Sequence, residues 1–185
     1  MSRKLVLTAV IACLGFVAGL AVASHLLAPP RTALAAVGPQ EVKKLTPADG
    51  HDIHVLAPHK IDGTVMGPYH HYCKSVSDTV LECMIYDSTD PKALLKQVEY
   101  FVAKSVTRPN VPLATWNKFY HDHAVEIATG RVQVLDRSPE EAKKIAEAAA
   151  QTDGIIFHLW WPDEAKAPNG VVKHPQSVGH VLRKE

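Results

Sequence analysis

The stretch "TVLECMIYD", residues 79–87, decides the fold class, because its side chains alternate along a short apolar run. Successive side chains of a β-strand point to opposite faces of the sheet, so alternation with period two predicts a strand. Two alternating sets share this run: Val80, Glu82, Met84 and Tyr86 in one, and Leu81, Cys83 and Ile85 in the other. The second set predicts that one face of this strand is fully buried.

Three further segments in the second half of the chain have strand character. Residues 98–103 are rich in β-branched and aromatic side chains, and residues 155–161, "IIFHLWW", form an apolar run typical of a buried strand. Residues 121–134 have the form of a β-hairpin, with Thr129 and Gly130 at its turn. Strands this close in sequence favour antiparallel pairing.

One helix stands out over residues 139–151, where alanine and isoleucine recur at helical spacing. Ser138 is the predicted N-cap and Glu141 completes a capping box, while Asp153 and Gly154 are expected to end the helix. The predicted fold class is therefore α+β: a small, mostly antiparallel sheet with one clear helix and long irregular termini.

The N-terminus predicts a targeting segment in front of the domain. Basic residues are followed by a long apolar run and an Ala-x-Ala pattern, so residues 1–35 are expected to be a signal peptide or an uncleaved membrane anchor. Proline and glycine punctuate residues 36–59, which predicts a linker and extended lead-in, and residues 60–185 are the predicted domain. Both alternatives place the domain outside the cytoplasm, in a periplasmic or extracellular space, with membrane contact only through the N-terminal segment.

Charge and cysteine content narrow the function classes. The net charge is +1, and removal of residues 1–35 takes away three basic residues and no acidic ones, which leaves −2. A mildly acidic domain without a basic run is not expected to bind nucleic acid. Cys73 and Cys83 either form a disulfide, as an oxidising compartment allows, or are two small buried side chains.

The candidate site begins at "YHDHAVEIATG", residues 120–130, within a chain that contains eleven histidines. On a strand, His121 and His123 point the same way and together can hold one metal ion. Glu126 lies an odd number of residues from both, so on a regular strand it faces the opposite side.

Other segments bring additional polar side chains to predicted strands. His71 precedes one strand, His158 lies in another among large apolar residues, and Glu99 lies in the segment "QVEYFV". A buried imidazole or carboxylate needs a partner, which favours a shared polar site. The remaining candidates lie in irregular segments and are expected to be solvated: His51, His54, His59, His174 and His180.

Five short motifs occur in an order that resembles a known family: "HHYC" at 70–73, "LECMIYDS" at 81–88, "VEY" at 98–100, "HDHAVEIATG" at 121–130 and "FHLWW" at 157–161. Over residues 60–162 the chain resembles the oil-body-associated protein family, of which it looks like a bacterial, exported member. The family pattern has tryptophan where this chain has Tyr120, and threonine where it has Leu159. The resemblance implies a fold and a set of polar positions, but no reaction.

Two function classes follow from these observations. In the first, an exported domain of unspecified activity binds a metal ion, such as zinc, iron or copper, or a small ligand. Its ligands would be His71, His121, His123 and His158, with Glu99 and Glu126 as ligands or catalytic general bases. In the second, the protein is a non-enzymatic lipid-surface or interaction protein, and the histidines form a structural network. The expected partner is an unknown small molecule or a lipid.

Overall fold

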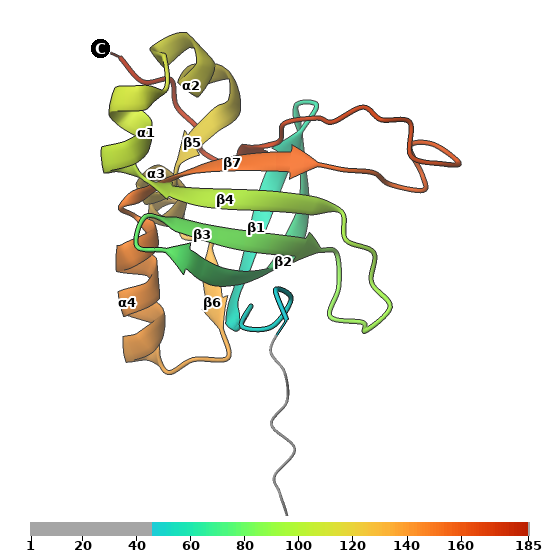
Figure 1. Ribbon diagram of the computed structural model, residues 1–185, viewed down its shortest axis with the longest axis horizontal. Coiled ribbons are helices and arrows are strands. Elements are labelled where there is room, and N and C mark those ends of the chain that lie inside the picture. The colour runs from blue at the N-terminus through green and yellow to red at the C-terminus, as the bar shows by residue number, and fades with distance from the viewer. Residues whose placement is uncertain (1–45, 185) are drawn as a thin grey trace, which may run out of the picture. The chain divides into compact units, whose positions relative to one another are not determined.

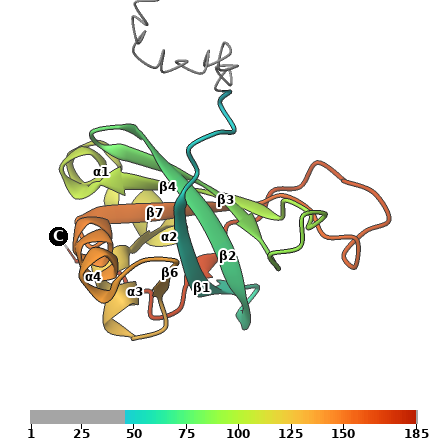
Figure 2. The ribbon, with the colours of Figure 1, turned by 90° about the horizontal axis from the view of Figure 1, so that it is seen from below.

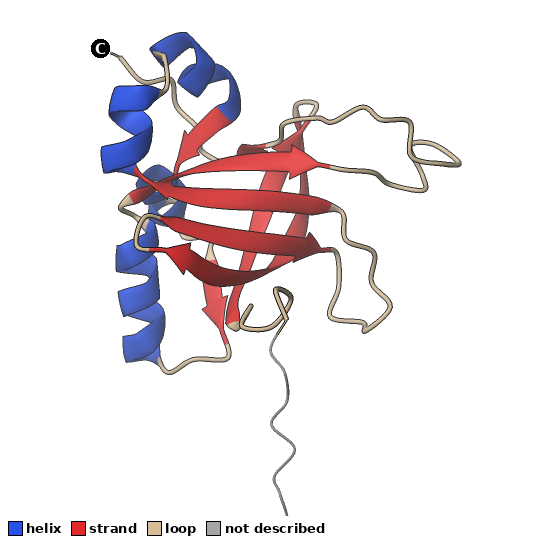
Figure 3. Ribbon diagram, in the orientation of Figure 1, coloured by secondary structure: helices blue, strands red, loops and turns tan. Residues whose placement is uncertain are grey.

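The computed structural model describes residues 46–184, which form an antiparallel sheet with helices gathered at one end (Figures 1 and 3). The strand order is β5-β7-β4-β3-β2-β1-β6, and β8 pairs with β1. The strands are β1 (Ile53–Ile61), β2 (Thr64–Ser77), β3 (Val80–Tyr86), β4 (Gln97–Ala103), β5 (Tyr120–Asp122), β6 (Gln133–Leu135), β7 (Thr152–His158) and β8 (Gln176–Ser177). The predicted signal or anchor at 1–35 lies outside the described residues.

The sheet curls strongly, so that β1 and β2 cross the direction of β4 and β7 (Figure 2). Directly paired residues of antiparallel strands point to the same face. One such row runs across five strands through Ile53, Cys73, Cys83, Glu99 and Ile156. The next row runs through Val55, His71, Ile85, Gln97 and His158. The inner face of the curl therefore carries apolar and ionisable side chains side by side.

A hydrophobic core occupies part of this inner face. It consists of Ile61, Tyr69, Cys73, Cys83, Ile85 and Phe101, which are all buried. Cys73 and Cys83 lie directly opposite each other on β2 and β3, and they form a disulfide. The disulfide thus decides between the two alternatives that the sequence left open.

The helices are α1 (Lys104–Asn110), α2 (Leu113–Phe119), α3 (His123–Ala128) and α4 (Pro139–Ala149). The prediction of a small sheet with one clear helix is wrong, because residues 46–184 contain eight strands and four helices. The first three helices have six or seven residues each, too few to show a helical period in sequence. The capping box of α4, with Ser138 and Glu141, is confirmed. No helix within residues 46–184 has the length and apolar character needed to span a membrane.

Helices α1 and α2 are held to the outer side of β7 by Asp153. Its carboxylate accepts hydrogen bonds from Thr107, Arg108 and the indole N–H of the buried Trp116. Burial alone would raise the pKa of Asp153, but these hydrogen bonds outweigh burial and lower the pKa below its ordinary value. Asp153 was expected to end α4; instead it lies inside β7 and anchors two helices.

The predicted hairpin over residues 121–134 is also wrong. The side chain of Asp122 accepts a hydrogen bond from the backbone N–H of Ala124 at 2.8 Å, which caps the start of α3. Gly130, with φ of +69°, follows the end of α3, where its N–H donates to the Ile127 carbonyl. Glycine favours this left-handed position after a helix, so the residue read as a hairpin turn is a helix C-terminus.

Candidate metal centre

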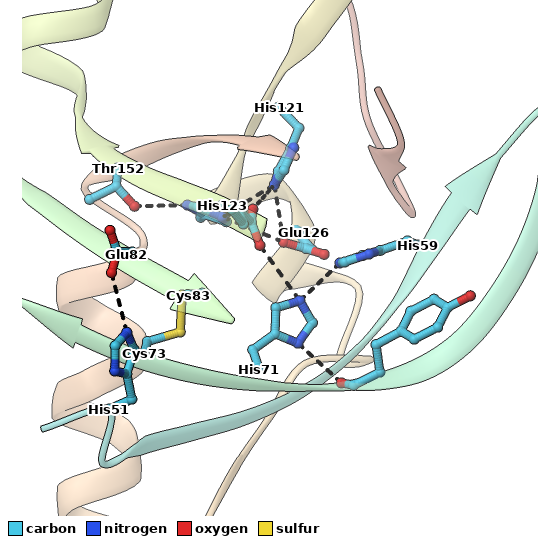
Figure 4. The surroundings of a disulfide bond; sticks show 12 residues. His51, His59, His71, Cys73, Glu82, Cys83, His121, His123, Glu126 and Thr152 are labelled. Atoms are coloured by element: carbon cyan, nitrogen blue, oxygen red, sulfur yellow. Dashed lines mark hydrogen bonds and ion pairs between the residues drawn. A yellow bond between two sulfur atoms is a disulfide. The ribbon is translucent and has the colours of Figure 1, made fainter. Parts of the chain in front are cut away.

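The Glu99 carboxylate, on β4, lies at the centre of a buried cluster of histidines. Glu99 pairs with Cys83 and so belongs to the side chains of β4 that point to the inner face. Its side chain is 2% exposed. Two groups of potential metal ligands share this residue: His59, His71 and Glu99 form one, and Glu99, His121 and His123 form the other. In each group the ligand atoms lie within 4.8 Å of one another. Figure 4 shows these four histidine side chains directed toward a common region.

His121 and His123 approach the same oxygen of Glu99. The Nε2 atom of His121 lies 3.1 Å from Glu99 Oε1, and that of His123 lies 3.2 Å from it. The two Nε2 atoms are 3.2 Å apart. The pair arises at a junction: His121 is the middle residue of the short strand β5, whereas His123 is the first residue of α3. The two imidazoles point together, as the sequence predicts. The cause is different, however: a strand-to-helix transition brings them together, and not the alternation of a single strand.

Glu126 joins the cluster because it lies on a helix. Residues three apart on a helix share a face, so Glu126 lies on the same side of α3 as His123. Its Oε2 atom is 3.8 Å from His121 Nε2 and 4.0 Å from His123 Nε2. The expectation that Glu126 faces away is wrong, for the same reason that the hairpin prediction is wrong.

Gly154 makes the approach of His121 to Glu99 possible. Strand β7 runs between β5 and β4, and Gly154 pairs directly with His121. A Cβ atom at Gly154 would collide with Nε2 of His121 and come within 2.5 Å of Glu99 Oε1. The imidazole therefore reaches across β7 through the space that the missing side chain leaves.

The second histidine pair faces the other oxygen of Glu99. His71 Nε2 lies 3.5 Å from Glu99 Oε2 and 3.0 Å from His59 Nε2. His59 was expected to be solvated, but it is 1% exposed and shares the inner face with Val55 and Ala57. The sequence did not predict this strand because Pro58 lies within it, and proline is unfavourable inside a sheet. The β1–β2 register shifts between Ala57 and His59, and Pro58 lies at this irregularity.

Three of the four imidazoles use Nδ1 to bind an oxygen. His71 Nδ1 faces the Tyr69 carbonyl at 3.1 Å, and His59 Nδ1 faces Gln97 Oε1 at 2.6 Å. His123 Nδ1 lies 2.7 Å from Thr152 Oγ1. The Thr152 hydroxyl donates its own proton to the Ala149 carbonyl, so it must accept from His123. These imidazoles therefore carry their proton on Nδ1 and turn the lone pair of Nε2 toward the cluster.

Burial and charge set the protonation of the two carboxyl groups. Burial would raise the pKa of Glu99, but contacts with His121 and His123 outweigh it and hold the pKa well below its ordinary value. Burial raises the pKa of Glu126 to about 7, with an added contribution from the charge of Glu99. Two carboxyl groups in one site thus differ widely in their affinity for a proton.

The imidazoles of His59 and His71 remain neutral. Burial, followed by the proximity of His71, lowers the pKa of His59 to about 3. Burial likewise lowers the pKa of His71, despite the opposing charge of Glu99. Neutral imidazoles are the form that binds metal ions.

His158 does not belong to the cluster. It is buried on the inner face, but its Nε2 atom pairs with Glu164 Oε2 at 3.0 Å, and its ring meets Trp161 edge-on. The other five predicted site residues come together in the cluster: His71, His121, His123, Glu99 and Glu126.

The sequence analysis did not predict three residues of the site: His59, Thr152 and Gly154. A glycine within an apolar strand was the one available indication, because it often marks a close approach.

Comparison with protein-family models assigns the chain to a family. Residues 46–178 match the family model described as "Protein of unknown function (DUF1264)". The chain belongs to this family. The match includes every residue of the histidine–glutamate cluster. No solved structure matches the chain.

Curated proteins similar to this chain include plant proteins. Oil body-associated protein 1B of Arabidopsis thaliana is 30% identical over 96 residues, which is 51% of this chain and 38% of that protein. Oil body-associated protein 2B of Zea mays is 32% identical over 100 residues, 53% of this chain and 38% of that protein. The resemblance to oil-body-associated proteins is confirmed, and the matches span well under half the length of these two relatives.

Proposed function

We propose that this domain binds a transition metal ion in the cluster, with His121, His123 and Glu99 as the primary ligand group. The observation that carries the proposal is the direction of the imidazole lone pairs. His123 donates its Nδ1 proton to Thr152, so a neutral His123 turns a lone pair toward the Glu99 carboxylate at 3.2 Å. Two acceptors this close repel each other unless a proton or a metal ion lies between them, and a single metal ion can be shared by His121, His123 and Glu99.

The His59 and His71 contact supports the same conclusion. Both rings direct Nδ1 toward an oxygen acceptor, so two Nε2 lone pairs face each other at 3.0 Å. A proton on either ring would relieve the repulsion, but burial disfavours an imidazolium at both positions. A bound metal ion satisfies these atoms without a buried imidazolium.

The arrangement of hydrogen bonds around the imidazoles is also the one that metal ligands use. A metal-binding histidine commonly donates its remote ring N–H to a carbonyl, hydroxyl or carboxylate oxygen, which fixes the ring and its tautomer. His71 and His123 both meet this description through Tyr69 and Thr152. Imidazole and carboxylate ligands suit zinc, iron and copper.

Because Glu99 has two oxygens that face different histidines, the cluster can hold either one ion or two, and the metal content distinguishes these cases. Oε1 faces His121 and His123, whereas Oε2 faces His71. One ion bound on the Oε1 side is the minimal site. A second ion between Oε2, His59 and His71 would make Glu99 a bridging carboxylate.

Glu126 is the candidate for proton transfer in a reaction on a bound small molecule. It belongs to neither group of potential ligands, yet it lies beside both His121 and His123. A carboxyl group with a pKa of about 7 is suited to general acid–base catalysis near neutral pH.

The test is the metal content of the full chain, purified without a histidine tag from cells supplied with zinc, iron and copper. We expect at least one ion per chain, lost in His121→Ala and in His123→Ala. His158→Ala is the matched control, since it removes a buried inner-face histidine outside the cluster and should retain the ion. Trace metal in a folded parent, or equal loss in all three variants, contradicts the proposal.

The alternative is a non-enzymatic protein that acts at a lipid surface. The names of the plant relatives support it, as do large apolar side chains exposed at Val171, Val172, Val181 and Leu182. The metal measurement separates the two functions. A folded protein without metal, whose His121→Ala and His123→Ala variants fold normally, would favour the lipid-surface function.

We also propose that the domain works in an oxidising compartment, as its N-terminal sequence predicts. The disulfide between Cys73 and Cys83 supports this location, because such bonds rarely persist in the cytosol. Thiol labelling in the native host should modify these two cysteines only after reduction. Labelling without reduction would place the domain in a reducing compartment.

A further inference from the structure

A cavity of about 450 Å³ lies between the inner face of the sheet and helix α4. Four strands contribute to its wall on the sheet side, and α3, α4 and β6 close the other sides. Helix α4 packs beside α3 and β6, as Figures 1 and 2 show. The volume falls within the range of roughly 300–1,000 Å³ that is typical of small-molecule sites.

Helix α4 turns its apolar stripe toward this cavity without burying it. Ala142, Ile145, Ala146 and Ala149 recur at helical spacing, and all four line the cavity. Each is only partly buried, and every residue of α4 keeps some exposure, although Ala149 also packs against the hydrophobic core. An apolar stripe normally packs against the core, so α4 bridges a space that an apolar molecule can occupy.

Most of the ionisable side chains of the cavity belong to one cluster. His71, Glu99, His123 and Glu126 line it, and all belong to the histidine–glutamate cluster. Lys143 is the remaining charged residue of the lining, and its side chain is 77% exposed. The other lining residues are aliphatic apart from Phe101, Cys73 and Pro139. The cavity therefore combines a largely aliphatic wall with one polar cluster.

We propose that the cavity binds a single-chain aliphatic amphiphile, with its chain beneath α4 and its oxygen-bearing head at the cluster. Apart from the exposed Lys143, the wall has no charged side chain away from the cluster, which disfavours ligands that carry polar groups along their length. The position of the chain follows from the cavity alone. The contact of the head with a metal ion rests on the proposed function.

The proposed metal ion predicts a difference between two probes. A metal ion bound by His121, His123 and Glu99 would bind the carboxylate head of dodecanoate, whereas the neutral hydroxyl head of dodecanol is a weaker ligand. Dodecanoate should therefore bind more tightly to the metal-loaded protein than to the metal-free protein, and dodecanol about equally to both.

The binding experiment is isothermal titration calorimetry of the zinc-loaded full chain with decanoate and dodecanoate, below their micellar concentrations. Each buried methylene contributes about 0.8 kcal/mol, so each added carbon should lower Kd about fourfold. Affinity that does not depend on chain length would overturn the proposal, because it would show that the chain is not buried.

Two matched variants test the location. Ala146→Phe places a ring in the cavity and should weaken dodecanoate binding at least about tenfold, while the metal content remains that of the parent. Lys144→Phe adds the same ring to the exposed side of the same helix and should leave binding unchanged. Parental affinity in Ala146→Phe would overturn the proposal.

The outcomes keep this proposal separate from the metal proposal. If the parent holds metal and binds neither decanoate, dodecanoate nor dodecanol, the cavity proposal is overturned and the metal proposal stands. If a metal-free His121→Ala variant still binds dodecanol, and Ala146→Phe abolishes that binding, the cavity proposal is supported without the metal.

Discussion

Substitution of Gly154 by alanine is the sharpest test of how the cluster is built. Gly154 lies within β7, and its φ is outside the left-handed region, so alanine fits the backbone there. In a strand without steric conflict, alanine in place of glycine stabilises a protein by about 0.5–1 kcal/mol. The structure predicts the opposite sign, because the new methyl group would overlap His121 and press on Glu99.

The expected magnitude follows from the nature of that overlap. Both neighbours are buried side chains from adjacent strands, not flexible ends that can turn into solvent. Overpacking of this kind costs about 1–3 kcal/mol, which exceeds the gain from the lost glycine. With the middle of each range, the net loss is about 1 kcal/mol, which lowers the melting temperature by about 2–4 °C in a chain of this size. Displacement of His121 should also weaken metal binding by about 10–100-fold.

The assays are urea denaturation of metal-free protein and chelator competition for the metal ion. Gly154→Ala is compared with the parent, with His121→Ala, and with the double variant in a thermodynamic cycle. Truncation of His121 frees most of the space, so the methyl group should cost at least about 1 kcal/mol less in the double variant. An unchanged or increased stability of Gly154→Ala in the parent background would refute the reasoning.

Three further predictions concern other parts of the fold. Thr152→Val removes the acceptor of the His123 Nδ1 proton and should weaken metal binding about 10–100-fold, measured by chelator competition. Paired serine substitutions of Cys73 and Cys83 should lower the free energy of unfolding by about 2–4 kcal/mol, and reductant should reproduce this loss in the parent. Asp153→Asn should cost about 1–3 kcal/mol in urea denaturation at neutral pH. Because the folded pKa of Asp153 lies below 3.8, its contribution is complete above that value and is lost as pH falls through the folded pKa, so the variant should show a shallower loss in acid.

The strands that could be predicted are those whose pattern is not interrupted. Residues 79–87 alternate without proline or glycine, and β3 spans Val80–Tyr86. Residues 98–103 fall within β4 for the same reason. Strand β1 could not be predicted in this way, because Pro58 interrupts its alternation. A register irregularity between Ala57 and His59 accommodates Pro58, and no local sequence pattern encodes such an irregularity.

Four separate segments supply the four histidines and Glu99, and this fact limits what sequence can show. His121 and His123 are close in the chain, so their shared site could be predicted from spacing. His59 and His71 come from β1 and β2, and Glu99 comes from β4. Their convergence depends on the order of the strands and on the curl of the sheet, which single-sequence patterns do not contain.

The error at Glu126 has a single local cause with a large chemical consequence. On a strand, with period two, a residue three positions from His123 points to the opposite face. On a helix, with period 3.6, it points to the same face as His123. The run 123–128 is too short to distinguish the two periods, so the choice depends on Asp122, whose side chain caps the backbone of Ala124. Lys104 and Arg108, which come from another helix, pair with the Asp122 carboxylate at 2.6 and 2.9 Å and hold the cap in place. A tertiary ion-pair network therefore favours a helix at this position, and the helix brings a second carboxyl group into the cluster.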